Sequence, residues 1–284
     1  MGSHHLKNGK PVPTSKIKVA LQAVYAANEA RILRWIHRII GIRWLHRGRK
    51  RVLRFLRFML SFLPSSEVVS LDRALDFVDY LAVHGDLEIA LGPCRCQEAL
   101  HPDRTSKRKE MVILFGTEAY RSSLAGYERL TVQEARSALR RFHRDGLIPA
   151  FFACLGSERW LFAICHCEAE SCVPLEVQKA VGKVYYPGPD IVAFDPEGCT
   201  GCGICIRRCH FGANTRNGKA VATGGAKGHG PPPKAPVLYD PASCYGCGVC
   251  VSTCPAGARR LVPREGYRSR YYPLEPILGH GAPP

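Results

Sequence analysis

The chain has 284 residues, of which 46% are hydrophobic and 23% are charged, and its formal net charge is +16. This composition provides enough apolar side chains for a buried core in one to three domains, which excludes a disordered protein. The 14 cysteines would suit a secreted disulfide scaffold only in a much shorter chain, so we expect a reducing, cytoplasmic location and anaerobic chemistry.

The positive charge is concentrated near the N-terminus. Residues 1–60 contain 14 Lys and Arg but a single acid, Glu29. Apolar residues recur there at helical spacing in two segments, with arginines on the intervening positions. They are Ile32, Trp35, Ile36, Ile39 and Ile40 in the first segment, and Val52, Phe55, Leu56, Met59, Leu60 and Leu63 in the second. We therefore predict that the region 1–65 forms basic amphipathic helices.

These predicted helices suggest a surface that binds an anionic or apolar partner. Neither can span a bilayer, because Arg54 and Arg57 interrupt an apolar run already shorter than the roughly 20 residues that a transmembrane helix needs. Residues 31–63 could instead lie on an anionic membrane surface as a peripheral anchor. The alternative that we favour is docking onto an acidic partner subunit or onto the body of this protein. Nucleic acid is a further anion, and we do not expect it as a partner.

The region 66–188 is predicted to be a small α/β domain. Ser70 has the side chain of a helix N-cap, and the pattern Thr131-Val-Gln-Glu134 is that of a capping box. The predicted elements, in chain order, are a helix from Ser70 to near Gly85, strands over 87–91 and 111–115, a helix from Thr131 to about Arg144, and a hairpin of residues 147–155 and 159–165. Helices and strands thus alternate along this region.

Five cysteines of this region predict a third metal or redox site. Cys94 and Cys96 lie in the turn that follows the first predicted strand, and Cys165 and Cys167 end the last one, with Cys172 shortly after. The two Cys-x-Cys pairs are expected to meet at one sheet edge. Converging thiolates suit an iron–sulfur cluster, which we favour, a structural zinc ion, or a dithiol that reduces a substrate.

The residues around these cysteines leave several roles open. His166 is a candidate ligand, a candidate proton donor to a thiolate, or a surface histidine, and we expect the last. Basic residues after the first cysteine turn would stabilise thiolates if they faced the site. They are Arg95, Arg104, Lys107, Arg108 and Lys109. We expect them to form a solvated loop.

Two cysteine quartets with the same spacing lie 45 residues apart. The first is Cys199, Cys202, Cys205 and Cys209, and the second is Cys244, Cys247, Cys250 and Cys254. Three cysteines at two-residue intervals let a tight loop wrap a cubane cluster, and the intervening glycines permit that turn. These are Gly201, Gly203, Gly246 and Gly248. A zinc ribbon needs two cysteine pairs rather than two quartets, so the sequence predicts two 4Fe-4S clusters.

The quartets carry a resemblance to bacterial two-cluster ferredoxin domains. It covers Asp195–Ala213 and Asp240–Ala258, which both run Asp-Pro-x-x-Cys-x-Gly-Cys-Gly. The resemblance implies a ferredoxin-like domain, which we place at 189–262. It also implies that the fourth cysteine of each quartet ligates the other cluster, so that Cys254 joins the first group and Cys209 the second.

Two features depart from that family. His210 stands where the family usually has the proline that follows the second quartet as Pro255. A long insert rich in Gly, Pro and Lys, Asn217–Pro236, separates the two repeats. A C-terminal tail at 263–284 follows the domain.

The upstream cysteines carry a second resemblance. The chain is similar to a class of anaerobe iron–sulfur proteins in which a Pro-Cys-x-Cys turn and a later cysteine-rich turn precede a two-cluster ferredoxin module. Pro93-Cys94-Arg95-Cys96 and Cys165–Cys172 match that pattern. The resemblance covers about Val69 to Ala258 and implies a third centre.

The fold class that we predict is α+β, in which basic amphipathic helices precede a small α/β domain and a ferredoxin-like domain. The function that we predict is single-electron transfer through two 4Fe-4S clusters to or from a third cysteine-ligated centre, within or beside a larger redox complex. One alternative is a reductase that acts at the five upstream cysteines, although no catalytic residue is assigned. Another is a redox-sensing regulator, because the helix from Thr131 and the following hairpin resemble a DNA-binding winged helix.

Overall fold

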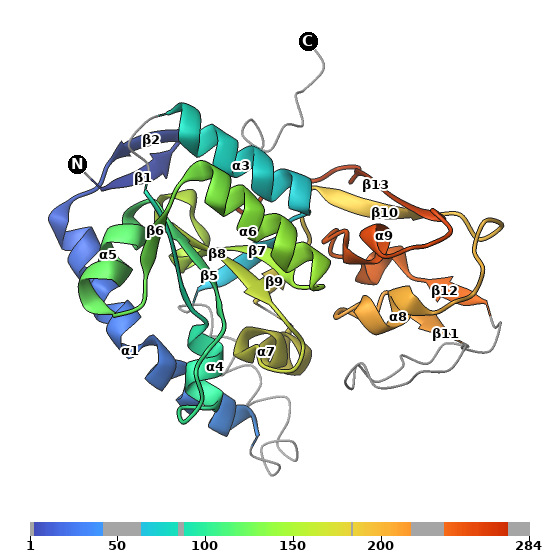
Figure 1. Cartoon of the computed structure of the whole chain (residues 1–284), viewed down its shortest axis with the longest axis horizontal. Helices are drawn as coiled ribbons and strands as arrows, with labels where there is room; N and C mark the ends of the chain where they lie inside the picture. Colours follow the sequence, from blue (N-terminus) through green and yellow to red (C-terminus); the bar gives the residue numbers. More distant parts are fainter. Residues whose placement is uncertain (1–2, 42–63, 85–87, 183, 217–235, 272–284) are drawn as a thin grey trace.

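The structure is a computed structural model that describes residues 3–41, 64–84, 88–182, 184–216 and 236–271 (Figure 1). Its α-helices are α1 (Lys16–Ile40), α3 (Leu71–Val83), α4 (Arg95–Leu100), α5 (Phe115–Ser123), α6 (Val132–Arg144), α7 (Val173–Val181), α8 (Ile204–Arg208) and α9 (Val249–Ser252). Short 3-10 turns cover Cys154–Gly156, Glu158–Trp160 and Pro241–Ser243. The helix predicted over 52–63 and most of the insert after Asn217 lie outside the described residues.

The strands are β1 (His4–Lys7), β2 (Lys10–Pro13), β3 (Ser65–Val68), β4 (Ile89–Pro93), β5 (Arg108–Ile113), β6 (Glu128–Leu130), β7 (Ile148–Ala153), β8 (Leu161–Cys167), β9 (Tyr185–Tyr186), β10 (Asp190–Phe194), β11 (Asn214–Arg216), β12 (Val237–Tyr239) and β13 (Arg259–Pro263). Seven of them form one sheet in the order β6-β4-β5-β8-β7-β3-β9. Neighbouring strands are antiparallel except β3 and β9, which are parallel. The protein is therefore α+β.

The sheet is covered on both faces (Figure 1). On one face lie α3 and α6, where Phe77 of α3 packs on Phe151 of β7 and Phe142 of α6 packs on His166 of β8. On the other face lies α1, which contacts α4, α5 and α7. Double coverage explains why β7 is a continuous run of buried residues rather than an alternating strand.

The predicted hairpin forms as β7 and β8, but it lies in the middle of the seven-stranded sheet. There β8 also pairs with β5, and β7 with β3. A wing projects from its domain, whereas these strands are enclosed by sheet on both sides. The winged-helix interpretation is therefore wrong.

The first basic helix packs on the protein itself. It begins at Lys16, well before the expected segment, with Ser15 as its N-cap. Leu33 and Ile36 are buried in the main core, while Trp35 is 65% exposed. Among the described helices, none is long and apolar enough to cross a membrane.

Several expected boundaries hold, and others shift. Ser70 caps α3, and Thr131 forms the expected capping box of α6. The strand expected to end before Gly92 continues to Pro93, and Cys94 is the N-cap residue of a helix rather than part of a turn. The next strand is shifted toward the N-terminus and runs from Arg108 to Ile113. It ends earlier than expected because Phe115 already belongs to α5.

The described residues from β10 to β13 form a smaller unit with its own core. Strand β10 pairs with β13 and β11 with β12, and the short helices α8 and α9 pack together. Asp190 at the start of β10 joins this unit to α3, because it accepts a hydrogen bond from Ser70 at 2.7 Å and pairs with Arg73 at 3.3 Å. The chain then returns to the large sheet, where the buried Tyr271 donates to the carbonyl of Ser65 at 2.6 Å.

Candidate functional site

The two quartets occupy equivalent loops that lead into α8 and α9. The predicted glycines of these loops, Gly201, Gly203, Gly246 and Gly248, all have φ between 70° and 81°. That left-handed conformation lets the cysteines on either side face inward. A side chain at Gly246 would also meet the carbonyl oxygen of Asp190. The expectation that glycine permits the wrapping turn is confirmed.

The quartets lie together in a crossed arrangement. Burial raises the pKa of the Cys205 thiol, and the charges of neighbouring cysteines raise it further. These neighbours are Cys202, Cys199 and Cys254. Burial likewise raises the pKa of Cys250 to about 12 and that of Cys247 well above its ordinary value, and Cys209 and Cys244 add to both. Cys209 therefore lies among the first three cysteines of the second quartet, with which it lines one hollow, and Cys254 lies close to Cys205 of the first quartet.

The donor set fits iron–sulfur clusters. Soft thiolates are the ligands that these clusters require, and each group supplies four of them. The second group surrounds a hollow of about 330 Å³ that is lined by Cys209, Cys244, Cys247 and Cys250. Cys205, Cys244 and Cys250 also belong to the apolar core of this unit, which limits the access of water to the sulfurs.

All five upstream cysteines line a second hollow, of about 860 Å³. Cys94 and Cys96 come from the start of α4, Cys165 and Cys167 from the same face of β8, and Cys172 from the N-cap of α7. The expected meeting of the two Cys-x-Cys pairs therefore occurs. The remaining walls are mostly apolar and include Ile32, Leu33 and Ile36 of α1.

Four of these thiols form a connected chain. Cys172 and Cys94 are the neighbours that raise the pKa of Cys96, and Cys167 and Cys96 are among the neighbours that lower the pKa of Cys172. Burial alone would raise the pKa of Cys172, but the adjacent Cys167, Cys96 and Tyr185 groups hold it well below its ordinary value. The Tyr185 hydroxyl lies 3.0 Å from Sγ of Cys167 and 3.3 Å from Sγ of Cys172. Negative charge is thus stabilised on a sulfur at the centre of the chain.

Cys165 stands apart from this chain. Its thiol donates to Oε1 of Glu110 at 3.8 Å, and Glu110 accepts a second hydrogen bond from the Tyr127 hydroxyl. Burial raises the pKa of both Cys165 and Glu110 well above their ordinary values. Cys165 is therefore held as a neutral thiol next to a carboxyl group.

The basic residues beside the cysteines are not all in a solvated loop, which corrects the expectation for two of them. Lys109 is 3% exposed, and its Nζ lies 2.8 Å from Oε1 of Glu168. The charge of Cys94 raises the pKa of Lys109 against the effect of burial. Arg95 is also buried and pairs with Glu98. Fixed positive charge therefore lies directly beside the thiols.

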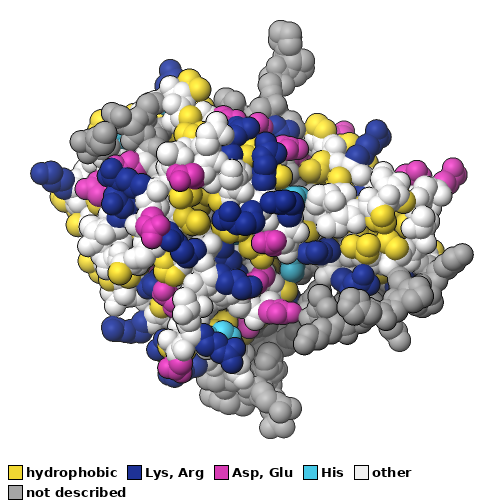
Figure 2. All heavy atoms as spheres, in the orientation of Figure 1, with side chains coloured by type: hydrophobic (Ala, Val, Ile, Leu, Met, Phe, Trp, Pro, Cys, Tyr) yellow, Lys and Arg dark blue, Asp and Glu magenta, His cyan; other side chains and the backbone are white. Residues whose placement is uncertain are grey.

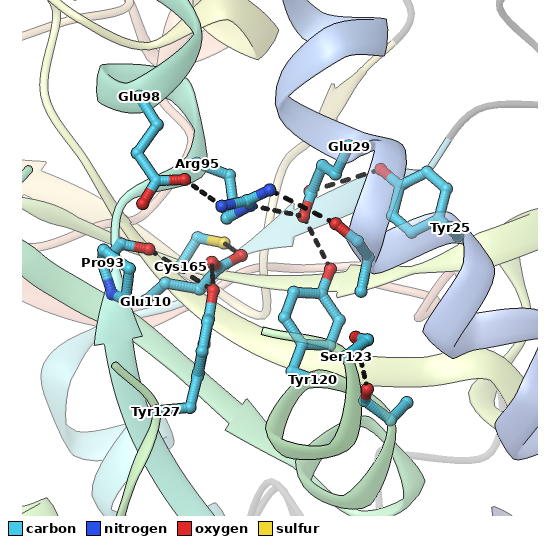
Figure 3. Close-up of polar contacts among 12 residues, drawn as sticks. Tyr25, Glu29, Pro93, Arg95, Glu98, Glu110, Tyr120, Ser123, Tyr127 and Cys165 are labelled. Carbon is cyan, nitrogen blue, oxygen red and sulfur yellow. Dashed lines mark hydrogen bonds and ion pairs between the residues drawn. The ribbon is translucent and has the colours of Figure 1, made fainter. Parts of the chain in front are cut away.

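A buried polar network lies next to the cysteine hollow (Figure 3). Glu29 of α1 accepts hydrogen bonds from Tyr120 at 2.8 Å and Tyr25 at 3.3 Å, and Arg95 lies 3.8 Å from it. Burial raises the pKa of Glu29 to about 7, although these partners oppose the shift. The network was not predicted, because its members come from distant segments and no local spacing marks them.

His166 is buried rather than on the surface, which corrects the expectation. The side chain is 2% exposed, and Nδ1 lies 3.0 Å from the carbonyl oxygen of Lys109. Its ring contacts Phe142 on the face of β8 opposite Cys165 and Cys167. Burial lowers its pKa to about 3. His166 therefore points away from the thiols.

A row of aromatic rings connects the two cysteine sites. Tyr185 contacts Phe211 at a centroid distance of 5.9 Å, and Phe211 stacks on Tyr245 at 3.9 Å with an interplanar angle of 12°. Tyr245 directly follows Cys244, and both Phe211 and Tyr245 line the hollow of the second quartet. In the sequence, Phe211 lies two residues after Cys209 and Tyr245 directly follows Cys244. No sequence pattern predicts that either ring lies near Tyr185.

Within the described residues, no group of three or more Cys, His, Asp or Glu side chains is arranged as a preformed site for a single metal ion. Residues 237–260 match the family model of the 4Fe-4S binding domain. Neither a curated protein nor a solved structure matches the chain. The matched segment contains the whole second quartet, and it supports at least one 4Fe-4S cluster and a role in iron–sulfur electron transfer.

Proposed function

We propose that this protein relays single electrons through two 4Fe-4S clusters to or from a third cysteine-ligated centre. Cys199, Cys202, Cys205 and Cys254 hold one cluster, and Cys244, Cys247, Cys250 and Cys209 hold the other. The crossed pKa effects among these thiols support the assignment. Each step moves one electron and breaks no covalent bond, so the protein needs only an external one-electron donor and acceptor.

The third centre is an iron–sulfur cluster held by Cys94, Cys96, Cys167 and Cys172. The connected chain of these four thiols supports this ligand set. The buried ammonium of Lys109 offsets part of the negative charge of a cluster there. Cys165 is left out, because it is hydrogen-bonded to Glu110 instead. Zinc with the same four ligands is the alternative.

The row Tyr185, Phe211 and Tyr245 is the observation that carries this proposal. Its first member contacts two thiols of the third site, and its last member adjoins a ligand of the nearer ferredoxin-type cluster. A continuous row of packed aromatic rings between two redox sites is what an internal relay requires. The third centre therefore exchanges electrons with the cluster of Cys209 and the second quartet.

The external partner is a redox protein or complex in the cytoplasm. Figure 2 shows Lys and Arg side chains across the middle of one face, with Asp and Glu among them. The exposed arginines of α6, Arg140, Arg141 and Arg144, lie on an element that contacts α9 beside the second quartet. An acidic redox protein fits this surface. Contact of residues 31–63 with an anionic membrane remains the alternative partner.

The proposal is tested by counting iron, acid-labile sulfide and zinc per chain in anaerobically purified protein. About twelve irons and about twelve sulfides, with no zinc, are expected for three cubanes. About eight of each with about one zinc would retain the two ferredoxin-type clusters but contradict the third redox centre. Absence of iron would contradict the whole proposal.

A second candidate function is a reductase that acts in the hollow of the third site. Its mostly apolar walls and the neighbouring carboxyl group of Glu29 favour it, since a small apolar substrate would find both room and a proton source there. Cyanide is a suitable probe. A change in the spectrum of the third centre on adding cyanide would indicate an open coordination position, and an unchanged spectrum would contradict the reductase.

A further inference from the structure

Arg259, the first residue of β13, is a buried cation. Its side chain is 5% exposed, and neither terminal nitrogen of its guanidinium has a hydrogen-bond partner among the described residues. Arginine is almost never fully buried unless it is paired, because removing its charge from water is costly. A negative group that the protein atoms do not supply is therefore needed beside it.

The surroundings of Arg259 indicate where that negative charge belongs. Its guanidinium lies over the ring of Phe194, 4.3 Å from the centroid, which fixes the side chain inside the smaller unit. The guanidinium also lies over the ring of Tyr239, 5.5 Å from its centroid, and Tyr239 lines the hollow of the second quartet. Phe194 and Tyr239 both pack against the small core that contains Cys205 and Cys250, one thiol from each quartet. Arg259 is therefore held beside the two cluster sites at once.

The two repeats differ at this position. Asn214 occupies the equivalent place in the first repeat, 45 residues earlier. It is buried as well, but it is neutral, and its amide donates to the carbonyl oxygen of Cys205 at 3.4 Å. Only the second repeat places a full charge here. The difference between Asn214 and Arg259 marks the charge as a feature of this chain rather than of the repeated loop.

We propose that Arg259 compensates the negative charge of both ferredoxin-type clusters and thereby raises their reduction potentials. This inference rests on the proposed function, because it requires both clusters. A one-electron reduction adds a negative charge to a cluster, and a fixed positive charge in a water-poor interior stabilises that reduced state. A single residue thus makes both clusters easier to reduce.

The test is a potentiometric EPR titration of Arg259→Met, with dithionite as the reductant and with iron content measured first. Arg260 is the next residue of β13 and is exposed, so Arg260→Met is a matched control that removes the same charge from the surface. In Arg259→Met the reduction equilibrium of both clusters should shift at least tenfold toward the oxidised state, which is about 59 mV for a one-electron couple. In Arg260→Met the shift should stay below about twofold.

Full iron content in Arg259→Met, with reduction equilibrium constants within twofold of the wild-type values, would overturn the inference. The clusters and the proposed function would remain intact. Arg259→Lys keeps the charge and should stay close to the wild type. Should Arg259→Met fail to assemble, Arg259→Gln is the second neutral variant. Loss of iron from both neutral variants but not from Arg259→Lys would support charge compensation, and equal loss from all three would contradict it.

Discussion

Replacing Cys172 by serine should remove the third centre and nothing else. Cys172 is at the middle of the thiol chain, hydrogen-bonded to the Tyr185 hydroxyl and adjacent to Cys96 and Cys167. Serine has nearly the same size and is a good N-cap for α7, so the fold should persist. The hydroxyl is a poor ligand for iron, and about four of about twelve irons should be lost, which is one third of the total. The EPR signals of the two ferredoxin-type clusters should be unchanged.

The matched control is Cys165→Ser. Cys165 lines the same hollow and is similarly enclosed, but its thiol is bonded to Glu110 rather than to the other sulfurs. This variant should keep about twelve irons. Iron and sulfide analysis of both variants, with EPR integration against the wild type, measures the difference. Full iron in Cys172→Ser, or loss of iron in Cys165→Ser, would refute the ligand set derived from the thiol contacts.

Three other predictions concern single side chains. Tyr185→Phe keeps the ring contacts but removes the hydroxyl beside Cys167 and Cys172. A hydrogen bond to a charged group contributes about 1.5–3 kcal/mol. In a redox titration, the reduction equilibrium of the third centre should therefore shift roughly tenfold toward the oxidised state. Equal potentials in the two proteins would count against that bond. Burial raises the pKa of Glu29 from 4.5 to about 7, so this carboxyl group binds more protons in the folded protein than in the unfolded chain between these values, and its contribution to the free energy of unfolding should fall by about 3 kcal/mol as pH rises through that window. Glu29→Gln should remove this contribution, so the change in unfolding free energy between pH 5 and pH 8 should differ from that of the wild type by about 3 kcal/mol, and an unchanged difference would contradict the shift. Phe151→Ala should lower the free energy of unfolding by about 3–5 kcal/mol in denaturant titrations, because the ring is fully buried between β7 and α3, and a cost below about 1 kcal/mol would contradict that packing.

The parts of the site that the sequence predicted well depend on local spacing. The glycines around Cys202 and Cys247 and the Cys-x-Cys pairs act within a few residues of each other, so their geometry follows from one loop or one strand. The caps at Ser70 and Thr131 are local in the same sense. Convergence of the five upstream cysteines was also predicted, because strand ends at one sheet edge lie close together.

The parts that the sequence did not predict depend on contacts between distant segments. Glu29 meets Tyr120 only because α1 packs beside α5, and Tyr185 meets Phe211 only because the smaller unit docks on β9. His166 was expected on the surface because that is the usual place of a lone histidine, whereas β8 is central and covered by α6. Sheet order and docking are long-range properties that no single segment encodes.

Rapid freeze-quench EPR tests the relay most directly. The wild-type protein, purified anaerobically, is mixed with less than one equivalent of a one-electron reductant, and samples are frozen over time. The account predicts that the signals of a ferredoxin-type cluster and of the third centre appear one after the other, the earlier declining as the later grows, with a slower transfer when Phe211 is replaced by leucine. A third site whose spectrum never changes at any potential would contradict the relay and indicate a structural metal instead.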